Sequence, residues 1–177
     1  IHGLVRDSLG RKMSKSLGNG LDPNKVISQS GADILRLWTA SIDYQADVRI
    51  SQSIINTVAD TYRKIRNTFK FLLANLSDGE NKSFNPETDM VKKYSKLGQY
   101  LLATLEKVKN DVLTDYNNYD FASATQEILS FLVQDVSAFY ASVAKDSLYC
   151  DEANSPRRKE YQSVIYQIVT TINILLA

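Results

Sequence analysis

The sequence of 177 residues has one cysteine, three prolines and a formal net charge of only +1. Cys150 has no second cysteine for a disulfide, and no group of cysteines and histidines has the spacing of a zinc site. We therefore expect a cytosolic segment that holds no metal. No apolar run approaches the roughly 20 residues that cross a bilayer. Because the charges nearly cancel, nucleic-acid binding requires a local basic patch.

Glycine is also scarce, and its distribution divides the chain. Five of the seven glycines fall within residues 1–50, where turns and short elements are expected. Beyond residue 50, apolar residues recur at helical spacing over long stretches. We therefore expect a first part with a short strand, a loop and short helices, followed by a helical bundle in residues 51–177.

Capping residues predict where the helices of the first half begin and end. Asp22 suits an N-cap, Pro23 suits the first helical position and Gly31 suits the position after the last turn. A second short helix follows directly. Ser51 then caps a long amphipathic helix that is predicted to end near Leu76.

Three more long helices are predicted in the second half. They run from about Met90 to Tyr116, from Phe121 (capped by Asp120) to about Leu148, and from Pro156 to the end. Long helices with short breaks are typical of an up-and-down bundle. The expected fold class is therefore all-α.

A basic loop interrupts the nearly neutral sequence: GRKMSKSLGNG, residues 10–20. Arg11, Lys12 and Lys15 lie there among glycines and two serines. Glycines let a backbone approach polyphosphate closely, and lysine ammonium groups stabilise charge that develops on phosphates. The Walker A pattern GxxxxGK[ST] is absent. An ordinary solvated turn is the alternative that composition leaves open.

Five consecutive residues of this loop, KMSKS from Lys12 to Ser16, are identical to the second signature of the class I aminoacyl-tRNA synthetases. The stretch HGLVRDSLGRKMSKSLGNGLDP resembles the surroundings of that signature in the isoleucine, valine, leucine and methionine enzymes. DVRIS, from Asp47 to Ser51, resembles the isoleucine-specific members and differs from the valine and leucine ones. YRKIRNTFKFLLANL and KDSLYCD resemble their anticodon-binding helical domain, so the resemblance covers essentially the whole chain.

The resemblance implies roles for the loop residues. Lys15 is implied to contact the ATP phosphates during amino-acid activation, with Lys12 as a supporting contact. Ser14 and Ser16 are implied to form the loop and to add hydroxyls to the ATP site.

The resemblance also implies partners and domains. ATP with magnesium, isoleucine and isoleucine tRNA are the implied ligands of a cytoplasmic enzyme that works as a monomer. Residues 1–50 would be the C-terminal end of its catalytic core, and residues 51–177 its anticodon-binding helical bundle.

The other ATP signature of this family, His-x-Gly-His, does not occur in the sequence, and the single histidine, His2, does not replace it. The family's editing domain and C-terminal zinc-bearing region are not found either. We therefore expect a fragment of a larger enzyme, which by itself binds no ATP and activates no isoleucine.

Three cations on the helix after Ser51 form a candidate tRNA surface. Arg63, Arg66 and Lys70 fall within an arc of about 60° at helical periodicity, and we call them the basic stripe. Such a stripe suits tRNA phosphates, although a solvated helix face is the alternative. A second cluster, residues 157–159, lies at a helix start and hints at a bound anion. The alternative functions are the valine-specific homologue and a structural or protein-interaction bundle without a tRNA role.

Overall fold

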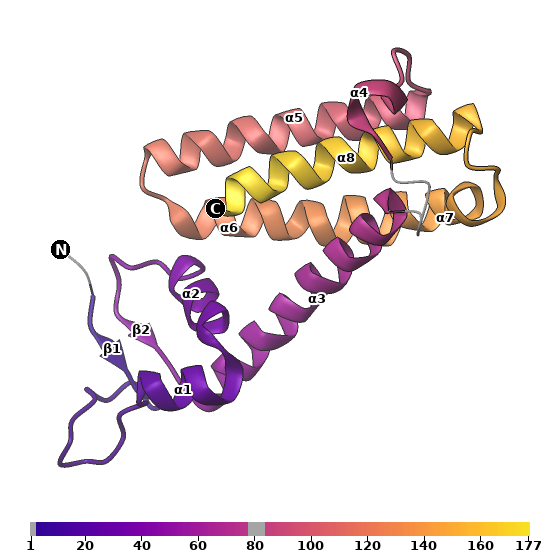
Figure 1. Cartoon of the computed structure of the whole chain (residues 1–177). Helices are drawn as coiled ribbons and strands as arrows, with labels where there is room; N and C mark the ends of the chain where they lie inside the picture. Colours follow the sequence, from indigo (N-terminus) through magenta and orange to yellow (C-terminus); the bar gives the residue numbers. More distant parts are fainter. Residues whose placement is uncertain (1–2, 78–83) are drawn as a thin grey trace. The chain divides into compact units, whose positions relative to one another are not determined.

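The computed structural model describes residues 3–77 and 84–177, and Figure 1 traces their path. His2, the only histidine of the sequence, lies outside the described residues. The chain falls into two compact units, Ile1–Lys64 with Asp115–Gln126 and Ile65–Thr114 with Glu127–Ala177.

The first unit contains a small pair of parallel strands. β1 (Val5–Arg6) pairs with β2 (Val48–Arg49), and Val5 lies opposite Val48. The Asp47 carboxylate stabilises this pair, because it accepts the Leu4 N–H at 2.8 Å and the Arg6 Nε–H at 2.6 Å. The short strand expected in the first part of the chain is confirmed, whereas its partner β2 was not predicted.

Two short helices follow the predicted caps: α1 (Pro23–Ser30) and α2 (Ala32–Ala40). The Asp22 carboxylate accepts the Asn24 N–H, and Gly31 ends α1 with a φ of 92°, which favours glycine. A small core lies beneath both helices. Its buried members are Val26, Ile34, Trp38, Ile50 and Ile55.

The long helix α3 (Gln52–Leu76) has the predicted limits. It begins after Ser51, whose hydroxyl accepts the Ile54 N–H at 3.3 Å. Ile55, at 0% exposure, packs in the small core, so burial of one apolar face adds to the cap in fixing where α3 begins.

The start of the next long helix differs from the prediction. A helix from about Met90 was expected, but α5 spans Lys96–Asn117 and a single-turn helix, α4 (Pro86–Asp89), precedes it. The Asn85 side chain caps α4, and Met90 then takes an extended conformation that ends it. The Ser95 hydroxyl accepts the Gly98 N–H at 3.2 Å and so caps α5.

The predicted helix from Phe121 is one helical stretch that reaches Cys150, but its middle is not α-helical. α6 (Phe121–Ser130) passes into a π-helix, η1 (Phe131–Tyr140), and then into α7 (Ala141–Cys150). No residue pattern in the sequence predicted this change of helix type. The last helix, α8 (Pro156–Leu176), begins at the predicted proline.

The second unit is a helical bundle. In Figure 1, α5, the stretch through η1 and α7, and α8 lie side by side and alternate in direction. α8 lies at its centre, because Ile165, Ile168 and Ile172 are each 0% exposed. The Gln162 side chain donates to the Asn75 carbonyl at 2.9 Å, which ties α8 to the last turn of α3.

The predicted fold class is confirmed: an all-α bundle preceded by a short strand, a loop and short helices. Among the described residues, no helix combines the length and the apolarity that a membrane crossing needs.

Candidate functional site

Asp7 organises the base of the basic loop. It is only 6% exposed. Its carboxylate accepts the Leu9 N–H at 3.0 Å, the Arg11 N–H at 2.8 Å, and the side chains of Arg11 and Asn19 at 2.9 Å each. The Asn19 amide, followed by the Arg11 donors, lowers the pKa of Asp7 from 3.8 to about 2. An ionised carboxylate therefore fixes the first turn of the loop.

Asn19 connects the second arm of the loop to this turn. Its Nδ2 donates to Asp7 Oδ2 at 2.9 Å and to the Lys12 carbonyl at 3.3 Å. Its Oδ1 accepts the Ser14 N–H at 2.9 Å. One side chain thus uses both its donor and its acceptor to join the two arms of the loop.

The tip of the loop is a tight turn that leaves both lysines in solvent. The Ser14 hydroxyl accepts the Leu17 N–H at 3.2 Å, and the Gly18 N–H donates to the Lys15 carbonyl at 3.2 Å. Gly18 has a φ of 60°, which favours glycine. Lys12 and Lys15 are exposed, and no ion pair holds either ammonium group within residues 3–77 and 84–177.

Met13 attaches the loop to the small core of the first unit. Its side chain is partly buried against the cluster that contains Trp38 and Ile55. On the other side of the loop base, the Arg6 guanidinium donates to the Gly10 carbonyl at 3.2 Å and pairs with Asp47. An open pocket of about 500 Å³ lies beside the loop, and Met13 and Lys15 contribute to its lining.

This arrangement suits an anion with several negative oxygens. Lys12 and Lys15 supply two exposed positive charges from a backbone whose shape is already set by hydrogen bonds. Charged donors that need little rearrangement stabilise developing negative charge effectively. The candidate ATP-phosphate residues Lys12, Ser14, Lys15 and Ser16 lie together on this loop, and the Ser14 and Ser16 hydroxyls lie 3.1 Å apart.

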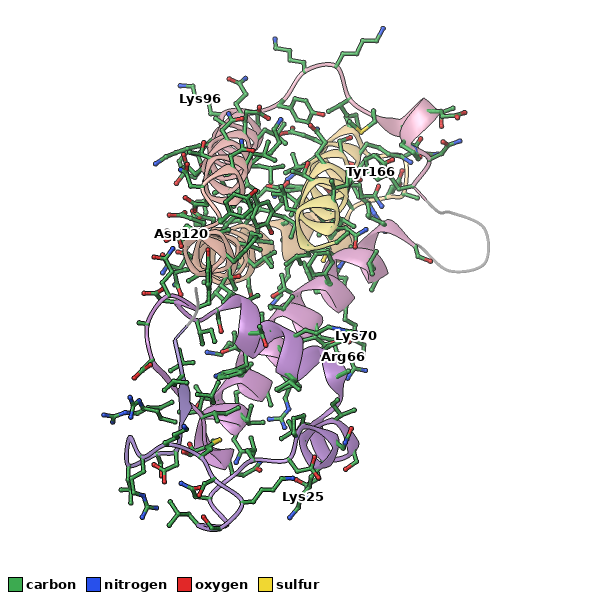
Figure 2. All side chains as sticks on the ribbon, turned by 90° about the vertical axis from the view of Figure 1, so that its left-hand side faces the viewer. Lys25, Arg66, Lys70, Lys96, Asp120 and Tyr166 are labelled. Atoms are coloured by element: carbon green, nitrogen blue, oxygen red, sulfur yellow. The ribbon has the colours of Figure 1, made fainter. Side chains whose placement is uncertain are left out.

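The basic stripe lies along α3. Figure 2 shows Arg66 and Lys70 projecting from the same side of this helix. Both side chains are exposed, and within the described part of the chain neither has an ion pair or a hydrogen bond. Arg63 lies on the same stripe, but its guanidinium pairs with Asp60 one turn earlier. The stripe therefore presents two open cations and a third that is shared with an acid.

The cluster at residues 157–159 has internal partners. Arg157 lies 3.8 Å from Asp146, Arg158 donates to the Asp151 carbonyl at 3.0 Å, and Lys159 pairs with Asp89 at 2.8 Å. These contacts join α8 to α7 and α4. The outside anion suggested by the sequence is therefore not needed to explain this cluster.

Sequence reasoning did not identify Asp7, the residue with the most contacts in the loop. A lone acid in a polar turn gives no local signal of burial. The available signal was Asn19 near the end of the loop, since an amide twelve residues away can bond to the acid and to the backbone between them.

Across residues 3–77 and 84–177, no three His, Cys, Asp or Glu side chains come together in a way that could hold a metal ion.

Two known protein families match this chain, one over the segment with the basic loop and one over the helical bundle. The family described as "tRNA synthetases class I (I, L, M and V)" matches residues 1–51, and the family described as "Anticodon-binding domain of tRNA ligase" matches residues 98–177. Together with the KMSKS sequence, these matches show that residues 1–51 are similar to class I aminoacyl-tRNA synthetases and that residues 98–177 are similar to the anticodon-binding domain of a tRNA ligase.

Within that class, the chain is similar to isoleucine–tRNA ligases. It is 48% identical to isoleucine–tRNA ligase 1 of Oceanobacillus iheyensis over 99% of its own length. The chain spans about a fifth of that relative, 19% of its length.

Two solved structures share the fold. Methionyl-tRNA synthetase of Mycobacterium tuberculosis, in complex with methionyl-adenylate, aligns with a TM-score of 0.78 at 24% identity, over 99% of this chain and 34% of that one. Leucyl-tRNA synthetase of Agrobacterium radiobacter, in a ternary complex with tRNA and LeuAMS, aligns with a TM-score of 0.67 at 21% identity, over 99% and 20%.

Proposed function

We propose that this chain is the part of an isoleucine–tRNA ligase that runs from the phosphate-binding loop into the anticodon-binding domain. Residues 1–50 are the end of the catalytic core, and residues 51–177 are the helical bundle. The whole enzyme uses ATP to activate isoleucine and attaches it to isoleucine tRNA, as a cytoplasmic monomer. The observation that carries the proposal is the KMSKS turn, with two exposed lysines on a hydrogen-bonded frame.

Lys15 acts on the activation step. The isoleucine carboxylate attacks the α-phosphorus of ATP, the bond to the bridging oxygen of the β-phosphate breaks, and pyrophosphate leaves with the electron pair. Negative charge grows on the pyrophosphate oxygens as that bond breaks. The Lys15 ammonium group stabilises this charge, and Lys12 supports it from the same loop. The Ser14 hydroxyl shapes the turn, because it accepts the Leu17 N–H.

Magnesium accompanies ATP in this reaction and neutralises phosphate charge when bound. Among the residues that the structure describes, no group of possible metal ligands lies beside the loop. All the described bonds of the Asp7 carboxylate are to N–H donors, and the Asp22 carboxylate caps α1. We therefore assign no residue of this chain to magnesium.

The basic stripe contacts the tRNA stem. Arg63, Arg66 and Lys70 face phosphates rather than base edges, since they form a narrow positive line on a rigid helix. The chain is almost neutral as a whole, so its net charge does not attract tRNA. The basic stripe supplies that attraction locally.

Isoleucine-dependent ATP–pyrophosphate exchange tests the proposal in the full-length protein that carries this chain. Isoleucine should support the fastest exchange, with valine and leucine far slower. Faster exchange with valine would identify the valine-specific homologue. No exchange with any amino acid would leave a structural or protein-interaction bundle as the better account.

A further inference from the structure

Two side chains close the base of the KMSKS loop, and neither belongs to the KMSKS sequence itself. Asp7 lies in the turn before the basic loop, Asn19 lies in the second arm of that loop, and Asn19 Nδ2 donates to Asp7 Oδ2 at 2.9 Å. We call this pair the Asp7–Asn19 clasp. Asp7 is 6% exposed, so water competes little for its hydrogen bonds.

The clasp acts directly on the backbone that carries both lysines. Asn19 donates to the Lys12 carbonyl at 3.3 Å and accepts the Ser14 N–H at 2.9 Å. The Asn19 side-chain amide therefore makes hydrogen bonds to the backbone of both Lys12 and Ser14, the residue just before Lys15. A rotation of that amide would shift the backbone of the turn, and with it the points from which both ammonium groups extend.

The donor and acceptor pattern makes the pair specific. Asp7 only accepts, and it already binds the backbone and side chain of Arg11. Asn19 must donate twice and accept once, which an amide does and a carboxylate does not. Aspartate at position 19 has almost the same shape, but it loses both donations and places a second negative charge against Asp7.

We propose that Asp7 and Asn19 are positioning residues for amino-acid activation: the clasp fixes the turn so that Lys12 and Lys15 meet the ATP phosphates in the transition state. This inference rests on the proposed function of the loop. The clasp touches no substrate and acts through the two lysines. Displacement of catalytic groups by about 1 Å can cost about 100-fold in rate, so a clasp of this kind affects the rate of the step.

The test uses five variants of the full-length protein, of which Lys15→Ala tests the proposed function of the loop itself. Asn19→Asp breaks the clasp, and Asp7→Asn breaks it from the other side. The exchanged double variant, Asp7→Asn with Asn19→Asp, restores one N–H···O bond between the two side chains. Asn24→Asp is the matched control, because it adds the same charge at an exposed position of α1 that follows the loop. Active-site titration normalises every rate to folded enzyme.

We expect Asn19→Asp to lower kcat of isoleucine-dependent exchange by at least about 10-fold, and to change the KM for isoleucine by less than about threefold. The exchanged double variant should recover part of this loss. Hydrogen exchange of the peptide covering residues 8–20 should become faster in Asn19→Asp and stay unchanged in Asn24→Asp. Peptides from α8 should keep their protection in all variants, which separates a local effect from unfolding.

The outcomes separate this inference from the proposed function. If Lys15→Ala leaves the exchange rate unchanged, the function proposed for the loop is wrong. If Lys15→Ala lowers the rate but Asn19→Asp leaves kcat unchanged, the clasp is only structural and the inference is overturned, whatever the hydrogen exchange shows. A loss in Asn19→Asp with no recovery in the double variant also contradicts the clasp, because the pairing would then not be what matters.

Discussion

Replacement of Arg66 by alanine should weaken tRNA binding in a manner that depends on salt and not on tRNA identity. Arg66 is exposed on α3, and no ion pair within the described residues competes for its guanidinium. Lys70, one turn further along, projects from the same side (Figure 2). A phosphate contact is the interaction that this geometry favours, since phosphates repeat along a stem and base edges are recessed.

The magnitude follows from counterion release. Each phosphate contact contributes about 0.7 to 0.9 to the slope of log affinity against log salt concentration. Loss of one contact should reduce the slope by that amount. Over the decade from about 1 M down to 0.1 M salt, a slope change of about 0.8 corresponds to about sixfold weaker binding at 0.1 M. Asp60→Asn should act in the opposite direction, because it releases Arg63 from its ion pair.

The assay is a fluorescence titration of isoleucine tRNA and of a non-cognate tRNA at several salt concentrations. Lys96→Ala is the control, since Lys96 is an exposed cation on α5 that is not part of the stripe. A loss confined to the cognate tRNA would mean that Arg66 reads identity and would refute the phosphate assignment. If neither slope nor affinity changes, the stripe is an ordinary solvated helix face.

Two further predictions concern the two units. A Cβ at Gly98 would lie 2.8 Å from Glu160 Oε1, the atom that accepts the Ser95 N–H at the start of α5. Gly98→Ala gains about 1 kcal/mol of helix propensity but loses the charged hydrogen bond to Glu160, which is worth about 1.5–3 kcal/mol. Chemical denaturation should therefore show that the free energy of unfolding falls by about 1 kcal/mol. A rise in that free energy would mean that the Glu160 hydrogen bond is not needed to stabilise the start of α5. The pKa of Asp7 is lowered to about 2, so its ionised form stabilises the fold fully above pH 4, and this contribution is lost as the pH falls through about 2. Carboxyl-carbon NMR should give a midpoint near 2 that rises toward 3.8 in Asn19→Ala, and an unchanged midpoint in that variant would show that the amide is not the main cause.

Helix limits set by local chemistry could be predicted from the sequence. The limits of α1 and α3 and the start of α8 follow from residues next to them in the sequence. These residues act through their own side chain or backbone preference: Asp22, Gly31, Ser51 and Pro156. The limit near Met90 could not be predicted in this way. Apolar spacing continues smoothly through that segment, and the decisive features are the separate caps of α4 and α5.

Features that depend on distant residues were not predictable. β2 pairs with a strand more than 40 residues earlier in the chain, through contacts of Asp47 with Leu4 and Arg6. The π-helix η1 has no sequence pattern that separates it from an α-helix.

In the candidate site, too, residues that a local motif carries could be predicted, and residues whose role depends on distant partners could not. The lysines of the loop were found because a fixed pentapeptide carries them. Asp7 was missed because its role exists only when Asn19 folds back against it. Of the basic clusters, the one at residues 157–159 looked like an anion site in sequence, yet its partners come from α4 and α7 and from the turn before α8.

Single-turnover formation of isoleucyl-adenylate by the Lys15→Ala variant of the full-length protein tests the central claim most directly. Lys25→Ala serves as the control, since Lys25 is an exposed cation of α1 shown in Figure 2. If Lys15 stabilises charge that develops as pyrophosphate leaves, the rate of adenylate formation should fall by at least about 100-fold, while the Kd for ATP changes by no more than a few-fold. An unchanged rate of adenylate formation would contradict the role proposed for the loop. So would a Kd for ATP that rises about 100-fold while the rate stays the same.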